Sequence, residues 1–166
     1  MNRQHRLIQS LTGHDDAVVL QFFVTFSRFE YALKQAGFVR GDLSYVAPDW
    51  DRFARERGNA LFAETENIEL TEAITLLRRE PPQRQIVRNN KVTWAQNAKR
   101  SGEGDAEYLL RLVRDVRNNL FHGGKYPSRN VSGQELRNSR LLRACLTILE
   151  ACLALDEDVK RLFEFL

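Results

Sequence analysis

The sequence predicts an all-α protein of five or six helices, folded as a single domain over residues 1–166. Three observations lead to this fold class. Apolar residues recur at intervals of three and four, the period of an α-helix, along most of the chain. Capping residues precede several of these segments, and glycine or proline follows them. No apolar run approaches the roughly 18 residues that a membrane-spanning helix needs.

Three helices are expected in the first half of the chain. The first begins after Thr12, which stands three residues before Asp15 in a capping-box spacing, and it ends at Gly37. The third ends before Pro81-Pro82, because proline lacks the amide proton that a helix interior requires. The expected bounds are about 13–36, 49–62 and 68–79.

Residues 80–104 have no helical period, and they contain a predicted small β-hairpin at about 85–94. Its turn is Asn89-Asn90, a dipeptide that tolerates positive φ. Residues 78–100 hold 7 basic residues and 1 acidic residue, a net charge of +6, with Trp94 among them. Aromatic and basic side chains together are typical of nucleic-acid binding. A solvated loop anchored by Trp94 is the alternative interpretation.

Helical period returns from about Asp105 to His122, and Gly123-Gly124 ends the segment. A long helix carrying Cys145 and Cys152 follows, and Asp156 caps a short last helix. Cysteines seven residues apart share one helix face and cannot form a structural disulfide. We therefore expect two buried thiols in a reducing, cytoplasmic protein. The N-terminus has no apolar segment typical of a secretory signal.

The formal net charge of +3 conceals an uneven distribution. Residues 1–77 hold 8 basic and 11 acidic residues, and residues 144–166 hold 2 and 5, so each segment has a net charge of −3. Residues 78–143 hold 15 basic and 6 acidic residues, a net charge of +9. The basic middle of the chain therefore favours a partner rich in phosphate.

One constellation in this basic segment has side chains suited to RNA chemistry. Arg117 is followed by Asn118, and His122 completes an Arg-x4-His spacing. The constellation resembles the signature of the HEPN superfamily, in which a polar residue follows an arginine and a histidine stands four to six positions on. Other segments are similar to a plasmid-associated, uncharacterised branch of that superfamily: Phe29-Glu30-Tyr31-Ala32-Leu33, Pro48-Asp49-Trp50, Pro81-Pro82 and Trp94.

The resemblance implies a HEPN-like helical bundle and a two-fold homodimer with both motifs in one shared groove. It implies a metal-independent endoribonuclease that acts on RNA and leaves a 2′,3′-cyclic phosphate. A toxin–antitoxin or defence system, with a cognate antitoxin as partner, is the setting that the superfamily suggests. No cofactor, metal or membrane association is expected, since no histidine–cysteine spacing indicates a zinc site.

These side chains match what such a reaction needs. A histidine can take the proton of the 2′-hydroxyl that attacks the adjacent phosphate. The position of His122 near a helix C-terminus favours the imidazolium form, which would also suit a general acid or a phosphate binder. The guanidinium of Arg117 would stabilise charge on the pentavalent phosphate, and Asn118 would orient the histidine or the phosphate. Three further basic residues are expected to attract the substrate: Arg111, Arg114 and Lys125.

Helix geometry places most of these residues on one polar face. At 100° per residue, Arg111, Arg114, Asn118 and His122 lie within about 80° of one another, on a face that we expect to stand free of the core. Arg117 lies at the margin of this face, about 140° from His122. For both to reach one phosphate, the helix end must unwind, Arg117 must curl round, or two protomers must combine their motifs.

A plainer interpretation remains beside this one. Arginine, histidine and glycine are also the residues that helix C-termini prefer. That interpretation leaves Asn118-Asn119 unexplained, because asparagine forms helices poorly. The functional alternatives are an endoribonuclease, a non-catalytic HEPN module that binds RNA or a nucleotide, and a dimerisation or partner-binding protein.

Overall fold

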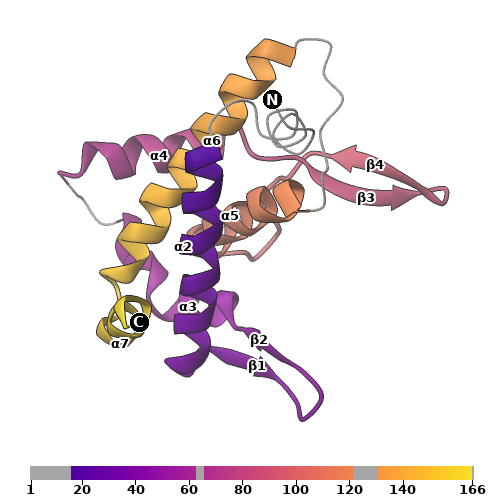
Figure 1. The fold of residues 1–166 in the computed structure, drawn as a ribbon. Helices are drawn as coiled ribbons and strands as arrows, with labels where there is room; N and C mark the ends of the chain where they lie inside the picture. The colour runs from indigo at the N-terminus through magenta and orange to yellow at the C-terminus, as the bar shows by residue number, and fades with distance from the viewer. Residues whose placement is uncertain (1–15, 63–65, 122–130, 166) are drawn as a thin grey trace.

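The structure is a computed structural model that describes residues 16–62, 66–121 and 131–165. Within these ranges six α-helices form the body, and two antiparallel hairpins project from it (Figure 1). The helices are α2 (Asp16–Gln35), α3 (Trp50–Glu56), α4 (Ile68–Arg79), α5 (Asp105–Phe121), α6 (Val131–Leu153) and α7 (Glu157–Glu164). One hairpin pairs β1 (Val39–Gly41) with β2 (Val46–Pro48), and the other pairs β3 (Arg84–Arg88) with β4 (Lys91–Ala95). The predicted helical class is confirmed, with hairpin β1–β2 as an unpredicted addition.

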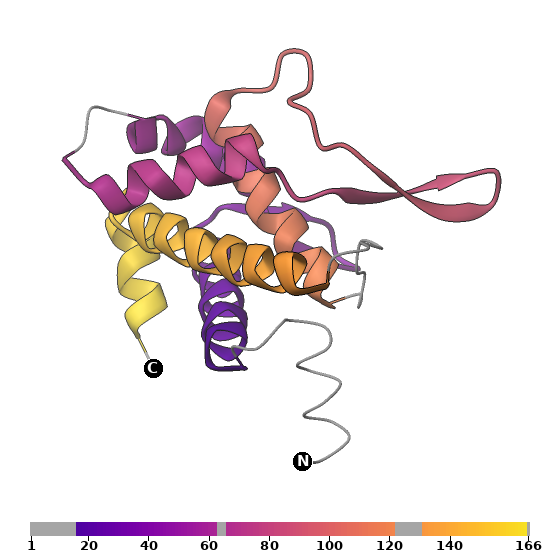
Figure 2. The same cartoon turned by 90° about the horizontal axis from the view of Figure 1, so that it is seen from above.

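Helix α6 packs against α4 on one side and against α2 on another, and α2 also packs against α7. Figure 2 shows α4 and α6 side by side, with α5 crossing the body next to them. Arg28 of α2 donates hydrogen bonds to the carbonyl oxygens of Leu162 and Phe163 at the end of α7, over 3.0 and 2.8 Å. Helix α2 is thereby fastened to the last elements of the chain.

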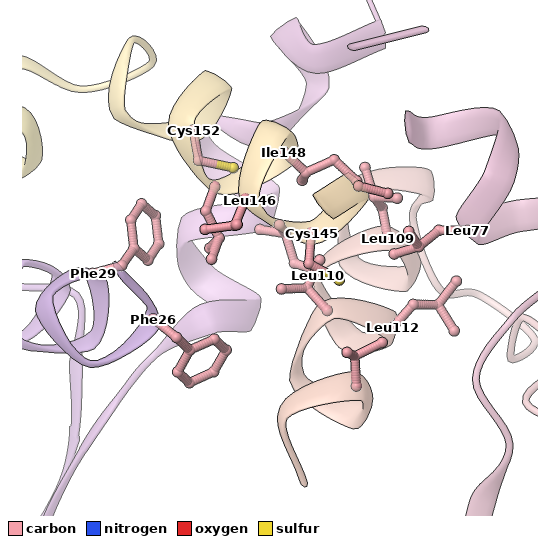
Figure 3. Close-up of a cluster of buried hydrophobic side chains, with 14 of the residues drawn as sticks. Phe26, Phe29, Leu77, Leu109, Leu110, Leu112, Cys145, Leu146, Ile148 and Cys152 are labelled. Atoms are coloured by element: carbon pink, nitrogen blue, oxygen red, sulfur yellow. The ribbon is translucent and has the colours of Figure 1, made fainter. Parts of the chain in front are cut away.

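The core lies where the apolar faces of these helices meet (Figure 3). Burial of one such leucine or phenylalanine contributes about 1.5–3 kcal/mol to stability. The predicted burial of Cys145 and Cys152 is confirmed. Figure 3 labels Phe26 and Phe29 from α2, Leu77 from α4, Leu109, Leu110 and Leu112 from α5, and Cys145, Leu146, Ile148 and Cys152 from α6.

Several predicted helix ends are confirmed. Gly37 ends α2 in the left-handed region with φ +88°, and the amide of Phe38 donates back to the carbonyl of Leu33 over 2.9 Å. Helix α4 spans Ile68–Arg79 as predicted. Asp156 caps α7 by accepting from two main-chain amides. The predicted cap at Thr12 lies outside the described residues.

The helix predicted over 49–62 is shorter than expected. Asp49 caps it, since its side chain accepts from the amide of Arg52 over 3.0 Å, but the α-helix ends at Glu56. A 3-10 turn, η1 (Gly58–Phe62), follows. Gly58 lies so close to α5 that a Cβ added there would stand 2.7 Å from the Cβ of Ala106. The change from α-helix to 3-10 turn therefore occurs where the chain packs against α5.

The predicted hairpin at about 85–94 is confirmed, with strands that extend it to Arg84 and Ala95. Asn89 and Asn90 have φ values of 52° and 57°, the left-handed conformation that a two-residue type I′ turn requires at both positions. The hairpin stands out from the helical body in both overall views (Figures 1 and 2).

Candidate functional site

Helix α5 carries four of the six predicted site residues: Arg111, Arg114, Arg117 and Asn118. The other two, His122 and Lys125, lie outside the described residues. Buried leucines and valines hold the first three turns of α5 in the core, whereas residues 117–120 are half-buried. The motif therefore begins where α5 leaves the core.

The side chain of Arg111 is buried and fully engaged within the protein. Arg111 is 5% exposed, and it donates from Nε and Nη2 to the two carboxylate oxygens of Glu103 over 2.6 and 2.8 Å. It also donates to the side-chain oxygen of Asn97 and to the carbonyl of Ala98. The expectation that Arg111 lies on a face free of the core is therefore wrong.

The physical reason is that residues 97–103 fold back over the first half of α5. Asn97 is itself buried, and the hydroxyl of Tyr108 donates to its carbonyl over 3.0 Å. The Arg111 guanidinium holds the pKa of Glu103 below its ordinary range, and Glu103 in turn raises the pKa of Arg111. Arg111 thus fastens a connecting segment to the helix, and its donors are occupied by this task.

Arg114 braces α5 against α3. Its Nη2 lies 2.8 Å from the carboxylate of Asp51, and both side chains are partly exposed. A paired arginine at the surface retains donors that point to solvent. Arg114 can therefore add positive potential near the motif, although part of its charge is balanced by Asp51.

Arg117 has a different environment from the other two arginines of α5. Its Nη1 donates to the Oδ1 of Asn118 over 3.0 Å, and its guanidinium lies over the ring of Phe121 at 4.4 Å and that of Phe26 at 5.5 Å. No carboxylate pairs with it among the described residues, and its buried Nε has no hydrogen-bond partner there. The guanidinium is positioned by aromatic contacts and an amide, with its charge unbalanced within the described chain.

The aromatic support of Arg117 comes from two helices. Phe121, at the end of α5, stacks on Phe23 of α2 with ring centroids 4.9 Å apart. Phe26, also on α2, contributes the second ring below the guanidinium. Cation–π contacts of this kind contribute about 0.5–2 kcal/mol, so they favour one orientation of the arginine. Helix α2 therefore helps to place the candidate site.

Asn118 and Asn119 have separate tasks. Asn118 accepts from Arg117, whereas Asn119 donates from Nδ2 to the main-chain oxygen of Gln83 over 2.6 Å. Gln83 immediately precedes β3, so Asn119 ties the hairpin to the end of α5. The side-chain oxygen of Gln83 is buried and has no partner among the described residues. Buried polar atoms without partners are uncommon in folded proteins.

Sequence reasoning missed Asn119, Gln83, Phe23 and Phe121. The one signal for them was the asparagine pair itself, which helix termination did not explain. The partners of that pair, a carbonyl from a distant loop and aromatic rings from another helix, depend on the tertiary fold.

Two features are absent from the described part of the chain. No three histidine, cysteine, aspartate or glutamate side chains there are grouped as a metal ion would require. None of the helices in these ranges combines the length and apolar character needed to cross a lipid bilayer.

Comparisons of this chain with protein-family models, with curated proteins and with solved structures gave no match. The assignment of a function therefore rests on the residues of this chain and on the resemblance of the Arg117–His122 motif.

Proposed function

We propose that this protein is a metal-independent endoribonuclease of HEPN type, with Arg117, Asn118 and His122 as its catalytic residues. The observation that supports the proposal is the state of Arg117. It is the one arginine of α5 without a carboxylate partner among the described residues, whereas Arg111 is bound by Glu103 and Arg114 by Asp51.

This difference matters because a phosphate needs a guanidinium whose charge and donors are free. Arg111 has no part in substrate binding in this proposal, since its donors are taken up inside the protein. Arg117 is held from one side by the Asn118 amide and by two aromatic rings. Preorganised donors of this kind stabilise charge in a transition state without reorganisation during the reaction.

The reaction proposed is an internal transesterification of RNA. His122 takes the proton from a 2′-hydroxyl, and the 2′-oxygen forms a bond to the adjacent phosphorus while the bond from phosphorus to the 5′-oxygen breaks. The departing 5′-oxygen takes up a proton, which leaves a 2′,3′-cyclic phosphate and a 5′-hydroxyl. Arg117 neutralises charge on the phosphate oxygens, and Arg114 and Lys125 attract the RNA.

The proposed groove is shared by two protomers, and an apolar surface beside Arg117 supports this part of the proposal. Leu20, Phe23 and Val24 on the outer side of α2 are exposed, with Leu20 at 64%. No residue from Ala17 to Ser27 is charged. A contiguous exposed apolar surface of this kind is typical of a protein interface. Since Phe23 stacks on Phe121, a second copy seated here would lie next to the motif.

The first experiment measures RNA cleavage in EDTA with a mixed-sequence RNA. We expect the wild-type protein to cut, and we expect Arg117→Ala to reduce the rate about 10²–10³-fold and His122→Ala about 10²–10⁴-fold. Arg40→Ala is the matched control, because Arg40 is an exposed arginine of β1 with no ion pair among the described residues.

Equal rates for wild type and both site variants at high enzyme concentration would exclude catalysis. Binding of the same RNA that weakens steeply with salt would then identify the alternative, a non-catalytic RNA-binding module. If the superfamily setting holds, expression of the wild-type protein also arrests growth, and His122→Ala relieves the arrest.

The second experiment tests the shared groove by light scattering. We expect a dimer for the wild type and a monomer for Leu20→Glu, because a buried carboxylate disfavours the apolar contact. Leu43→Glu, at the fully exposed tip of hairpin β1–β2, is the matched control and should leave the dimer intact. A monomeric wild-type protein would exclude the shared groove.

A further inference from the structure

Hairpin β3–β4 has two chemically different faces. In a β-hairpin successive side chains point to opposite faces, and directly paired residues share a face. The register pairs Arg88 with Lys91 and Val87 with Val92. One face therefore carries Arg84, Arg88 and Lys91, and the other carries the two valines, which are 73% and 68% exposed.

The basic face has no acidic counterpart. No aspartate or glutamate occurs in residues 84–102. The side chains of Arg84, Arg88 and Lys91 are exposed, and they make no ion pair or hydrogen bond within the described part of the chain. By contrast Lys99, further along the same segment, pairs with Asp105 over 2.6 Å. Three cations without an ion-pair partner in the described residues are thus grouped on the projecting hairpin.

The pairing of Arg88 with Lys91 is unfavourable for the hairpin by itself. Like charges directly opposite each other on antiparallel strands destabilise the pair. The Val87–Val92 pair and the Asn89-Asn90 turn are what favour the hairpin on its own. An anion bound across Arg88 and Lys91 would remove the repulsion, so this end of the hairpin is suited to a phosphate.

The base of the hairpin is fastened to α5, which carries the candidate site, and to α6. Asn119 of α5 donates to the carbonyl of Gln83, and Arg137 of α6 donates to the carbonyls of Glu80 and Pro81 over 3.2 and 3.1 Å. Asn119 adjoins the Arg117–Asn118 pair, so hairpin and motif share one anchor. The hairpin is an arm with a set direction relative to the end of α5.

We propose that hairpin β3–β4 is a substrate-binding arm that holds the phosphate backbone of the RNA on Arg84, Arg88 and Lys91. This inference rests on the proposed function for the identity of the nucleic acid. The arm grips RNA some distance from the cleaved bond, and the three cations lie along about 13 Å of strand. It binds without reading sequence, because phosphate contacts are the same for every base.

The experiment uses the full chain and a fluorescein-labelled single-stranded RNA of mixed sequence, with anisotropy measured across a range of salt concentrations. R88Q/K91Q should weaken binding about tenfold or more at low salt. It should also reduce the slope of log affinity against log salt by about 1.4, the value for two lost phosphate contacts on a single strand. R40Q/R79Q is the matched control, since it removes one exposed arginine of β1 and one at the end of α4, and it should leave both quantities unchanged.

The melting temperature of R88Q/K91Q should equal or exceed that of the wild type, because the variant removes a like-charge pair from the surface. A variant that binds with the affinity and salt slope of the wild type overturns the proposal. The proposal is also overturned if R88Q/K91Q loses binding to vesicles containing phosphatidylglycerol but keeps its binding to RNA. That result would identify the arm as a membrane contact. An equal loss for a DNA oligonucleotide of the same sequence supports contact with phosphates.

The two proposals fail in different measurements. If Arg117→Ala and His122→Ala do not alter cleavage, the catalytic proposal fails, whereas a shallower salt slope for R88Q/K91Q still establishes the arm. If R88Q/K91Q binds and cleaves RNA as the wild type does while Arg117→Ala is inactive, the proposal of a substrate-binding arm fails and the catalytic proposal is retained.

Discussion

Asn119 and Gln83 join two parts of the chain that sequence analysis treats as separate. The 2.6 Å hydrogen bond from the Asn119 amide to the Gln83 carbonyl fixes the base of hairpin β3–β4 on the last turn of α5. The residue before it, Asn118, faces another partner, Arg117. Two adjacent asparagines thus connect one helix end to the hairpin and to the candidate catalytic arginine.

Replacement of each asparagine should have its own signature. Asn119→Ala removes the tie to Gln83, so we expect faster amide exchange in residues 84–95 and a loss of about 1 kcal/mol in unfolding free energy. Asn118→Ala should leave exchange in the hairpin unchanged and lower RNA cleavage, because it releases the Arg117 guanidinium. Hydrogen exchange read by mass spectrometry separates the two. Identical exchange patterns for both variants would contradict the division of tasks.

The Glu103–Arg111 pair should make stability depend on pH in the acid range. The pKa of folded Glu103 is lowered, chiefly by its hydrogen bond from Arg111. A lowered folded pKa means that the stabilisation is complete above the ordinary value near 4.5 and is lost as the pH falls through the folded value. The unfolding free energy, measured with urea at several values between about pH 6 and pH 3, should therefore fall less with decreasing pH for Glu103→Gln than for the wild type.

Glu103→Gln should also cost about 2 kcal/mol at neutral pH, since it removes the charge from a hydrogen bond in a poorly exposed place. Glu72→Gln is the control, because Glu72 is an exposed residue of α4 with no ion pair among the described residues. If the unfolding free energy of Glu103→Gln depends on pH as steeply as that of the wild type, Glu103 is not the group that causes the pH dependence.

Gly58 should not tolerate alanine. The added Cβ would meet the Cβ of Ala106 at 2.7 Å, and neither atom can rotate away, so η1 and α5 must separate. We expect Gly58→Ala to lower the unfolding free energy by about 1–3 kcal/mol. In the double variant Gly58→Ala/Ala106→Gly the obstructing atom is gone, and a double-mutant cycle in urea should show a favourable coupling. Additive costs in that cycle would contradict the contact.

The two cysteines should be unreactive in the folded protein. Cys145 and Cys152 are fully buried, and burial raises the pKa of both thiols far above neutral pH. Since the thiolate is the reactive form, a disulfide reagent should modify neither residue in native buffer and both in denaturant. Rapid reaction in native buffer would contradict the burial. Cys145→Ala and Cys152→Ala assign any residual rate to one position.

Local patterns in the sequence were sufficient for most helices and for one hairpin. The bounds of α4 were predicted from apolar spacing and from Pro81-Pro82 as stop, which act within a few residues. Asn67 caps this helix in the structure, a cap that the prediction did not name. The turn of β3–β4 follows from Asn89-Asn90, because asparagine tolerates the positive φ that a type I′ turn requires at both positions. Hairpin β1–β2 escaped prediction, since strands of three residues have too few side chains to show alternation.

Local sequence patterns predicted only part of the candidate site. A helical wheel places Arg111 and Arg114 on one face, but it does not say what covers that face. The cover of Arg111 comes from Asn97 and Glu103, and the partner of Arg114 comes from α3. These contacts depend on how residues distant in sequence come together, which no periodicity encodes. The wheel did place Arg117 at the margin of the core, and its contact with Phe26 agrees with that position.

The attachment of α2 to α6 and α7 has a consequence for synthesis on the ribosome. Phe26 and Phe29, on the buried side of α2, stack on Trp50 of α3, whereas other parts of α2 pack against α6 and α7, which follow much later in the chain. Until α6 and α7 have left the exit tunnel, the part of α2 that packs against them stays without its cover, and a nascent chain offers it to solvent or to chaperones. The core of the described residues is therefore complete only when α6 and α7 have joined α2 and α3.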